Sequence, residues 1–216
     1  MEIWLDTTDC TTIELGHKMG ILHGVTTNPS LILESGKNLE TVLDEVLSHQ
    51  NGPVTAQVTA PDHTTIVEQA ETLREFSERV IPKIPVTQEG LKAMSALSHL
   101  HFPIMATTIF SPTQALLACQ AGAQFIAPYF SHIKNPLETL ESILFMIERY
   151  AFESKVVVAS FKTVEQVYEC LELGVDAVTL KKEIFEKFVA DQPNTFERLE
   201  RFSRDWKKAQ PSKLLS

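Results

Sequence analysis

The chain has 216 residues, of which 44% are hydrophobic, and it carries a net charge of −9. This length is enough to bury a full core, and we expect one domain over residues 1–216. The acidic balance and the lack of any basic run argue against nucleic acid and against an anionic membrane surface as partners.

Short apolar runs alternate with longer amphipathic segments, which predicts alternating strands and helices. The eight runs predicted as strands are Ile3–Thr7, Gly24–Asn28, Val54–Ala60, Val80–Val86, Pro103–Ile109, Gln124–Phe130, Lys155–Phe161 and Ala177–Leu180. The predicted helices include Asn38–His49, Thr64–Ser77, Glu89–Leu100, Pro136–Tyr150 and Thr163–Leu173, then Lys182–Val189 and Asn194–Lys208. Helix N-caps are expected at Thr87, Ser111 and Thr163, and C-caps at Gly122 and Gly174.

Eight strand–helix repeats with near-continuous apolar strands predict a parallel sheet covered by helices. Eight strands close a (β/α)8 TIM barrel, here with an extra C-terminal helix. An open doubly wound sheet is the alternative, but the chain lacks the glycine-rich first turn of that fold's nucleotide site. Pro82 and Pro85 count against the fourth strand because each removes a ladder donor; the repeat nevertheless requires a strand there.

Lys83 lies inside the apolar run Val80–Val86, where an unpaired ammonium group is unfavourable. In a buried strand, desolvation would lower the pKa of the amine and make it a nucleophile toward a ketone or aldehyde. The alternative is a strand-edge lysine whose stem packs on the sheet while its head reaches water.

Polar residues also occur near the ends of most other predicted strands. They are Asp6, Thr26, Thr27, Asn28, Gln57, Thr107, Thr108, Tyr129 and Ser160. Each has a structural alternative, as a helix cap, an ordinary strand threonine or a core tyrosine with its hydroxyl at the surface. Because barrel enzymes gather their chemistry at the C-terminal strand ends, the whole set together with Lys83 favours a Schiff-base site.

In such a site neutral Lys83 would attack a ketose carbonyl, and the iminium would accept the electrons of the adjacent carbon–carbon bond. Asp6 suits proton transfer or the binding of substrate hydroxyls. Tyr129, with a water held by Gln57 and Thr107, suits transfer of the proton from the hydroxyl that becomes the aldehyde.

Several absences narrow the chemistry and the compartment. The chain has no HExxH, GxxxxGK[ST] or GxGxxG motif, which argues against metal, nucleotide and dinucleotide chemistry. Its three cysteines lack CxxC spacing, which favours free thiols in a reducing compartment. With no basic leader and no run of roughly 18 apolar residues, a cytoplasmic protein is expected.

Six segments carry distinctive motifs: Leu5–Thr7, Gly24–Ser30 (GVTTNPS), Ala56–Val58, Lys83–Leu91 (KIPVTQEGL), Ala127–Tyr129 and Ala159–Thr163. Over essentially the whole chain they resemble the small transaldolase/fructose-6-phosphate aldolase family. The resemblance implies a (β/α)8 barrel that needs no metal or organic cofactor and forms a Schiff base on a lysine of the fourth strand. By matching position that lysine is Lys83, the family's aspartate is Asp6 and its TTN asparagine is Asn28.

Within that family, transaldolases carry a glutamate, a phenylalanine and a serine where this chain has Gln57, Tyr129 and Ala127. All three positions resemble the aldolase branch, which releases dihydroxyacetone from fructose 6-phosphate or adds it to aldehydes. A true transaldolase of the pentose phosphate pathway, acting between sedoheptulose 7-phosphate and glyceraldehyde 3-phosphate, is an alternative. So is a dihydroxyacetone aldolase with a non-phosphorylated acceptor. A barrel that only binds sugars would be expected to have lost Lys83 or Asp6, and neither is lost.

The phosphate site departs from the family pattern. Relatives place a phosphate-binding arginine three residues after Tyr129, where this chain has His132, and the glycine-rich segment that follows is replaced by Lys134–Glu138. Substrate binding is therefore assigned to Thr26, Asn28, Ser160, Lys162 and His132, with the phosphate expected near Ser160 and Lys162, after the seventh strand.

Lys181 and Lys182 follow the eighth strand, where relatives often have no charge. They either compensate for the missing arginine or are solvated residues that open a helix.

The resemblance also implies a homo-oligomer, a pentamer or decamer, in which the C-terminal helix packs on a neighbouring subunit. Phe202 and Trp206 share one face of the predicted C-terminal helix and suit such a contact. They would equally suit a helix that covers its own barrel.

Overall fold

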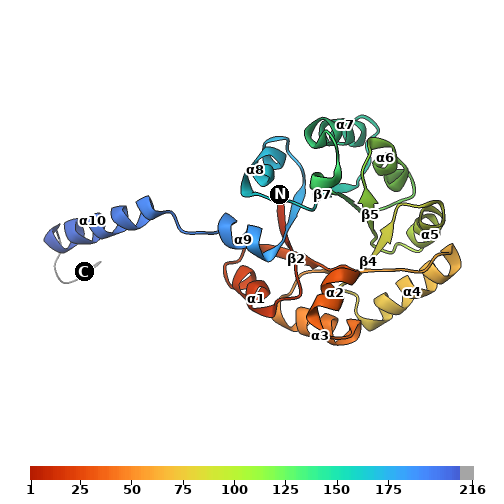
Figure 1. Ribbon diagram of the computed structural model, residues 1–216, viewed down its shortest axis with the longest axis horizontal. Helices are drawn as coiled ribbons and strands as arrows, with labels where there is room; N and C mark the ends of the chain where they lie inside the picture. Colours follow the sequence, from red (N-terminus) through yellow and green to blue (C-terminus); the bar gives the residue numbers. More distant parts are fainter. Residues whose placement is uncertain (210–216) are drawn as a thin grey trace. The chain divides into compact units, whose positions relative to one another are not determined.

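The computed structural model describes residues 1–209 and contains a closed barrel of parallel strands (Figure 1). The strands are β1 (Glu2–Asp6), β2 (Leu22–Thr26), β3 (Val54–Gln57), β4 (Val80–Pro85), β5 (Met105–Ile109), β6 (Phe125–Pro128), β7 (Lys155–Val158) and β8 (Ala177–Leu180). Each strand pairs with the next in chain order, and β8 pairs with β1 to close the ring. The predicted (β/α)8 barrel is confirmed.

Helices connect successive strands and surround the ring of strands (Figure 1). They are α1 (Cys10–Lys18), α2 (Pro29–Ser35), α3 (Leu39–His49), α4 (His63–Phe76), α5 (Gln88–His99), α6 (Pro112–Gln120), the 3-10 turn η1 (Phe130–His132), α7 (Pro136–Arg149) and α8 (Val164–Glu172). After β8 the described residues continue with α9 (Lys182–Phe188) and α10 (Pro193–Ala209). Within residues 1–209, no helix combines the length and apolarity that crossing a bilayer requires.

The predicted caps form. The side chains of Thr87, Ser111 and Thr163 accept hydrogen bonds from backbone N–H groups in the first turns of α5, α6 and α8. Gly122 and Gly174 follow α6 and α8 with positive φ angles of 87° and 83°, a backbone region that favours glycine. The local sequence thus fixes where these helices begin and end.

The fourth strand forms despite its prolines, with Pro82 in register with Ala56 of β3 and Pro85 in register with Thr107 of β5. The carbonyl groups of β4 still accept hydrogen bonds from the neighbouring strand segment. The backbone N–H of Val58, for example, donates to the carbonyl of Lys83. Several other strands end two or three residues earlier than predicted. There the chain leaves the ladder to build the loops at the mouth of the barrel.

The barrel interior is filled by apolar side chains below the mouth. Trp4, Ile81, Met105 and Phe125 are buried together, with small residues from β6, β7 and β8 completing the cluster. Because side chains alternate along a strand, the residue two positions after each of these faces the interior again, nearer the C-terminal end. Those positions are Asp6, Lys83, Thr107 and Ala127.

The chain divides into two compact units, Met1–Phe185 and the segment from Glu186 onward. The first contains the whole barrel. In the second, α10 has no buried residue, and its side chains Phe196, Phe202 and Trp206 are about half exposed. The predicted C-terminal segment 194–216 extends beyond the described residues, so its last seven positions (210–216) lie outside them.

Candidate active site

A cavity of about 460 Å³ lies at the C-terminal ends of the barrel strands. It is lined by Asp6, Asn28, Pro29, Ser30, Gln57, Lys83, Tyr129, His132, Ala159, Ser160 and Lys181. These residues end or follow seven of the eight strands, so residues far apart in the sequence meet in one place.

Lys83 lies in this cavity with only 4% of its surface exposed. Ile81, two residues earlier on the same face of β4, is also buried, so the stem of Lys83 continues from the apolar barrel interior. Burial lowers the pKa of Lys83, and the charge of Asp6 opposes that shift in part. Its Nζ donates one hydrogen bond, 3.2 Å long, to the backbone carbonyl of Thr27. The buried-strand interpretation of Lys83 is therefore confirmed over the strand-edge alternative.

Asp6 is held at the end of β1 by neighbours on β2 and just after it. Thr26 Oγ1 donates to Asp6 Oδ1 at 2.9 Å, and Asn28 Nδ2 lies 3.5 Å from the same oxygen. Thr26 Oγ1 is also 2.8 Å from Thr179 Oγ1, so Thr179 is the donor of that bond because the single proton of Thr26 goes to Asp6. These hydrogen bonds from Thr179 through Thr26 to Asp6 orient the carboxylate at the mouth of the barrel.

Asp6 and Asn28 were both possible helix caps, and of the two only Asn28 caps a helix in the structure. Asp9, not Asp6, caps α1, since Asp9 Oδ1 accepts from Thr12 N at 2.7 Å. Asn28 does cap α2, through its Oδ1 and Leu31 N. That bond turns the amide nitrogen of Asn28 toward Asp6, so Asn28 both caps a helix and lines the cavity.

Tyr129 follows β6 and also lines the cavity, and its hydroxyl lies 2.9 Å from Thr107 Oγ1. Thr107 is fully buried at an irregularity in β5, where the register with β6 shifts between Ala106 and Ile109. Thr108, the next residue, has a φ of 59°, which is unusual for a β-branched side chain and typical of functional sites. Burial raises the pKa of Tyr129, with the bond to Thr107 acting in the opposite direction, so the phenol stays protonated at neutral pH.

Gln57 ends β3 in register with Lys83 on the adjacent strand, and both line the cavity. Among the described residues, no hydrogen-bond partner is recorded for its side-chain amide. Its donor and acceptor are therefore free to hold a substrate hydroxyl or a water.

His132 and Ser160 form the outer edge of the cavity. Ser160 Oγ lies 3.2 Å from His132 Nδ1, and the imidazole packs against the ring of Tyr129 with centroids 5.9 Å apart. Ser160 has a φ of 68°, and its carbonyl accepts hydrogen bonds from the backbone and side chain of Ser131. The loops after β6 and β7 thus hold one another.

The predicted site residues divide into three groups. Seven line the cavity: Asp6, Asn28, Gln57, Lys83, Tyr129, His132 and Ser160. Thr26 and Thr107 are buried directly behind it and orient Asp6 and Tyr129. Lys162 is exposed and is not a lining residue.

Sequence reasoning did not assign two further positions, Ser30 and Thr179, and it left the role of a third, Lys181, open. Ser30 lines the cavity and belongs to the GVTTNPS motif, so the motif itself carried the signal. Thr179 is a polar residue inside the apolar strand β8, the same kind of signal that identified Thr26. Lys181, which the sequence left either compensating for the missing arginine or solvated at the start of a helix, lines the cavity immediately after β8. For metals, the described residues contain no group of three or more His, Cys, Asp or Glu side chains placed to hold an ion.

The fold and this cavity define a class: a (β/α)8-barrel protein with a buried lysine among carboxylate, amide and phenol groups at the mouth of the barrel. Comparison with known proteins agrees with that class. The model of the family described as transaldolase/fructose-6-phosphate aldolase matches residues 3–213. The chain belongs to this family.

Individual relatives match over nearly their whole length. A protein of Bartonella bacilliformis named "Probable transaldolase" is 37% identical over 212 residues, covering 96% of this chain and 97% of the relative. A protein of Coprothermobacter proteolyticus with the same name is 36% identical, with the same coverage of both chains. One of Aquifex aeolicus, again so named, is also 36% identical over 212 residues.

Proposed function

We propose that this protein is a cofactor-independent Schiff-base aldolase that cleaves a ketose phosphate, such as fructose 6-phosphate, and releases dihydroxyacetone. The observation that carries the proposal is Lys83: a 4% exposed lysine with a lowered pKa that lines a cavity large enough for a sugar phosphate. A buried amine with no ion-pair partner among the described residues destabilises the fold, and strongly perturbed groups of this kind cluster at functional sites.

The first half of the reaction forms the iminium. The neutral Nζ of Lys83 attacks the C2 carbonyl carbon, and the carbonyl oxygen takes a proton to give a carbinolamine. Loss of that hydroxyl as water, with proton transfer assisted by Asp6, leaves the iminium. Thr26 and Asn28 hold the carboxylate in place for this step.

The second half breaks the C3–C4 bond. A base removes the proton of the C4 hydroxyl, the aldehyde leaves, and the bonding electrons pass to the iminium to give an enamine. Tyr129, bonded to Thr107, and a water held by Gln57 suit the transfer of that proton. Protonation at C3 and hydrolysis by water then release dihydroxyacetone and regenerate the amine.

A transaldolase is the second candidate, favoured by the names of the three relatives. In that case the enamine attacks a second aldehyde instead of taking up a proton. Gln57 and Tyr129 favour the aldolase, because the resemblance places glutamate and phenylalanine at these positions in transaldolases. Free dihydroxyacetone released from fructose 6-phosphate, measured with and without erythrose 4-phosphate, separates the two activities.

The decisive experiment is reduction with borohydride in the presence of dihydroxyacetone or fructose 6-phosphate, followed by intact-mass and peptide mass spectrometry. We expect an adduct on the peptide that contains Lys83, absent from Lys83→Ala and retained in Lys92→Ala, a surface lysine on α5. A folded wild-type protein that gives no adduct with either ketose contradicts the proposal.

We further propose a cytoplasmic homo-oligomer, a pentamer or decamer. Support comes from α10, which has no buried residue and leaves Phe196, Phe202 and Trp206 about half exposed. Sedimentation of the wild type beside Phe202→Glu/Trp206→Glu tests this: the variant is expected to form smaller species. Equal masses would argue against the role of α10.

A further inference from the structure

A second cavity of about 520 Å³ adjoins the active-site cavity, because Asp6, Asn28, Ser30 and Lys181 line both. It extends over the loops that follow β1, β2 and β8. Lys181 therefore lies at the boundary between the two cavities. The other charged residues of each cavity decide in which of the two Lys181 can bind an anion.

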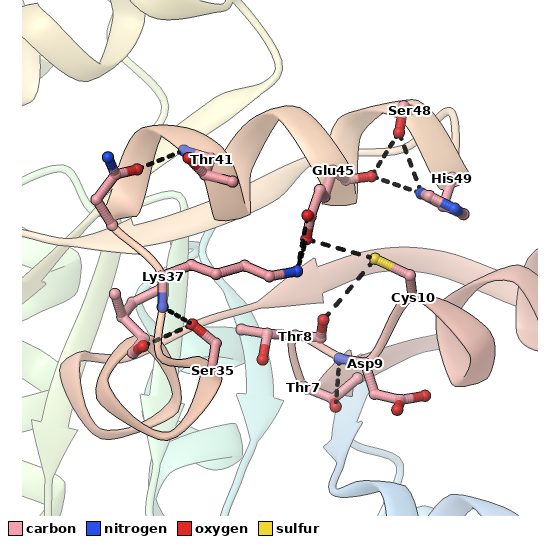
Figure 2. A network of polar contacts seen from close by, with 12 residues as sticks. Thr7, Thr8, Asp9, Cys10, Ser35, Lys37, Thr41, Glu45, Ser48 and His49 are labelled. Atoms are coloured by element: carbon pink, nitrogen blue, oxygen red, sulfur yellow. Dashed lines mark hydrogen bonds and ion pairs between the residues drawn. The ribbon is translucent and has the colours of Figure 1, made fainter.

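Two of the three lysines that line the second cavity are already paired. Lys37 Nζ lies 2.7 Å and 2.6 Å from the two carboxylate oxygens of Glu45, an arrangement that Figure 2 shows beside Cys10. Lys182 Nζ lies 3.3 Å from Asp9 Oδ2. Neither charge is free to bind a substrate without breaking an existing ion pair.

Lys181 differs from both. Its side chain is exposed, and among the described residues no hydrogen bond or ion pair is recorded for its ammonium group. Among the described residues that line the active-site cavity, it is also the only lysine or arginine besides Lys83. Since Lys83 is buried and reserved for the carbonyl, Lys181 is the cation available to a substrate there.

The acidic residues place the anion on the active-site side. The Asp6 carboxylate lines both cavities and so favours neither side, whereas Asp9, Glu34 and Glu183 line only the second cavity. A phosphate group would be repelled by these carboxylates and attracted by Lys181. On the active-site side it also meets two hydrogen-bonding groups, the Ser160 hydroxyl and the His132 ring.

We infer that Lys181 binds the phosphate group of the substrate and sets the preference for phosphorylated over unphosphorylated sugars, with Ser160 and His132 as neighbouring contacts. This inference rests on the proposed function and assigns its anion-binding residue. Lys181 replaces Lys162 as the expected phosphate-binding lysine, because Lys162 is exposed and does not line the cavity. Lysine binds phosphate as a point charge, and loops after strands seven and eight commonly hold phosphate in this fold.

The test compares kcat/KM for fructose 6-phosphate and for fructose in the wild type, Lys181→Gln, Lys181→Arg and Lys162→Gln. Lys187→Gln, a surface change of the same charge, is the control. We expect the wild type to prefer the phosphorylated sugar. In Lys181→Gln that preference falls by about 10- to 100-fold, the loss typical of a hydrogen bond to a charged group. Lys181→Arg retains most of the preference, and Lys187→Gln retains all of it.

A second measurement keeps this inference separate from the proposed function. Binding of inorganic phosphate is followed by calorimetry, and dihydroxyacetone adducts are trapped with borohydride in the same variants. Trapping in Lys181→Gln together with weakened phosphate binding supports both ideas. An unchanged preference and unchanged phosphate binding in Lys181→Gln, or loss of the preference in Lys162→Gln instead, overturns the inference while the adduct leaves the aldolase proposal standing. Failure of the wild type to form any adduct contradicts the aldolase alone, because phosphate binding still reports on Lys181.

Discussion

The amine of Lys83 donates a hydrogen bond to the backbone carbonyl of Thr27, 3.2 Å away, and within residues 1–209 it has no other hydrogen-bond partner. Asp6 influences the amine through space but forms no ion pair with it. A single carbonyl acceptor can be satisfied by a neutral amine, whereas an ammonium ion in this position would leave two protons unpaired. The geometry therefore favours the nucleophilic form.

The first prediction concerns stability and pH. The folded-state pKa of Lys83 is lowered from its ordinary value of 10.5, so folding is penalised wherever the unfolded lysine is protonated. The penalty is fully present below the folded-state pKa and is lost as the pH rises toward 10.5. Lys83→Met should raise the free energy of unfolding near pH 7 by about 0.5–2 kcal/mol. This gain should shrink with increasing pH.

Urea unfolding at several pH values measures this effect. Lys134→Met, at an exposed position, is the control and should show no such pH dependence. A difference between Lys83→Met and the wild type that stays constant from pH 7 to about pH 10 would contradict a lowered pKa.

The second prediction concerns Asp6. Its negative charge raises the pKa of Lys83 against the larger effect of burial. Asp6→Asn removes that charge, so the pKa of Lys83 should fall further and the acid limb of adduct formation should move to lower pH. The rate of borohydride trapping with dihydroxyacetone, measured across pH, reports this shift. Asp44→Asn, on the exposed face of α3, should leave the limb in place, and a shift of the Asp6→Asn limb to higher pH would refute the electrostatic argument.

The barrel was predictable because its signals are local and repeated. Each apolar run, helix cap and C-terminal glycine is encoded within a few residues, and eight repeats leave few topologies open. Strand ends were less predictable. Beyond β3, β6 and β7 the apolar pattern continues past the last strand residue, because residues such as Val58 and Phe161 are buried in the loops that follow.

The site was predictable in its residue types but not in its contacts. Polar residues inside apolar strands identified Lys83, Asp6 and Gln57, since the barrel must bring strand ends together. That Lys181 rather than Lys162 lines the cavity depends on the backbone path after β7 and β8. The positive φ of Ser160 on that path is an unusual conformation that no residue pattern signals.

The third prediction concerns the hydroxyl of Tyr129. Tyr129→Phe removes the group that is 2.9 Å from Thr107 while leaving the ring packed against Phe110 and His132. Cleavage of fructose 6-phosphate should slow by about 10²–10⁴-fold, the range for general acid–base groups. Trapping of the dihydroxyacetone adduct should persist, since Lys83 is untouched. Tyr150→Phe, at an exposed tyrosine, is the matched control, and an unchanged cleavage rate in Tyr129→Phe would exclude the hydroxyl from proton transfer.

The fourth prediction links packing to the position of the nucleophile. Gly90 lies in the first turn of α5, where a Cβ atom would come within 2.0 Å of the carbonyl oxygen of Pro85, two residues after Lys83. Because this contact would be with a backbone atom of β4 and not with a flexible side chain, α5 and β4 cannot easily move apart to relieve it. Gly90→Ala should lower the free energy of unfolding by about 1–3 kcal/mol, as overpacking typically does. It should also slow adduct formation by displacing β4.

Gly16 in α1 provides the control for Gly90. A Cβ atom there would meet only side chains, at 3.3 Å or more, and alanine is the better helix former. Gly16→Ala should therefore destabilise the fold less than Gly90→Ala does and should trap dihydroxyacetone at the wild-type rate. Thermal unfolding and trapping kinetics on both variants decide the matter. A Gly90→Ala protein with wild-type stability and kinetics would show that the close contact between α5 and β4 does not position Lys83.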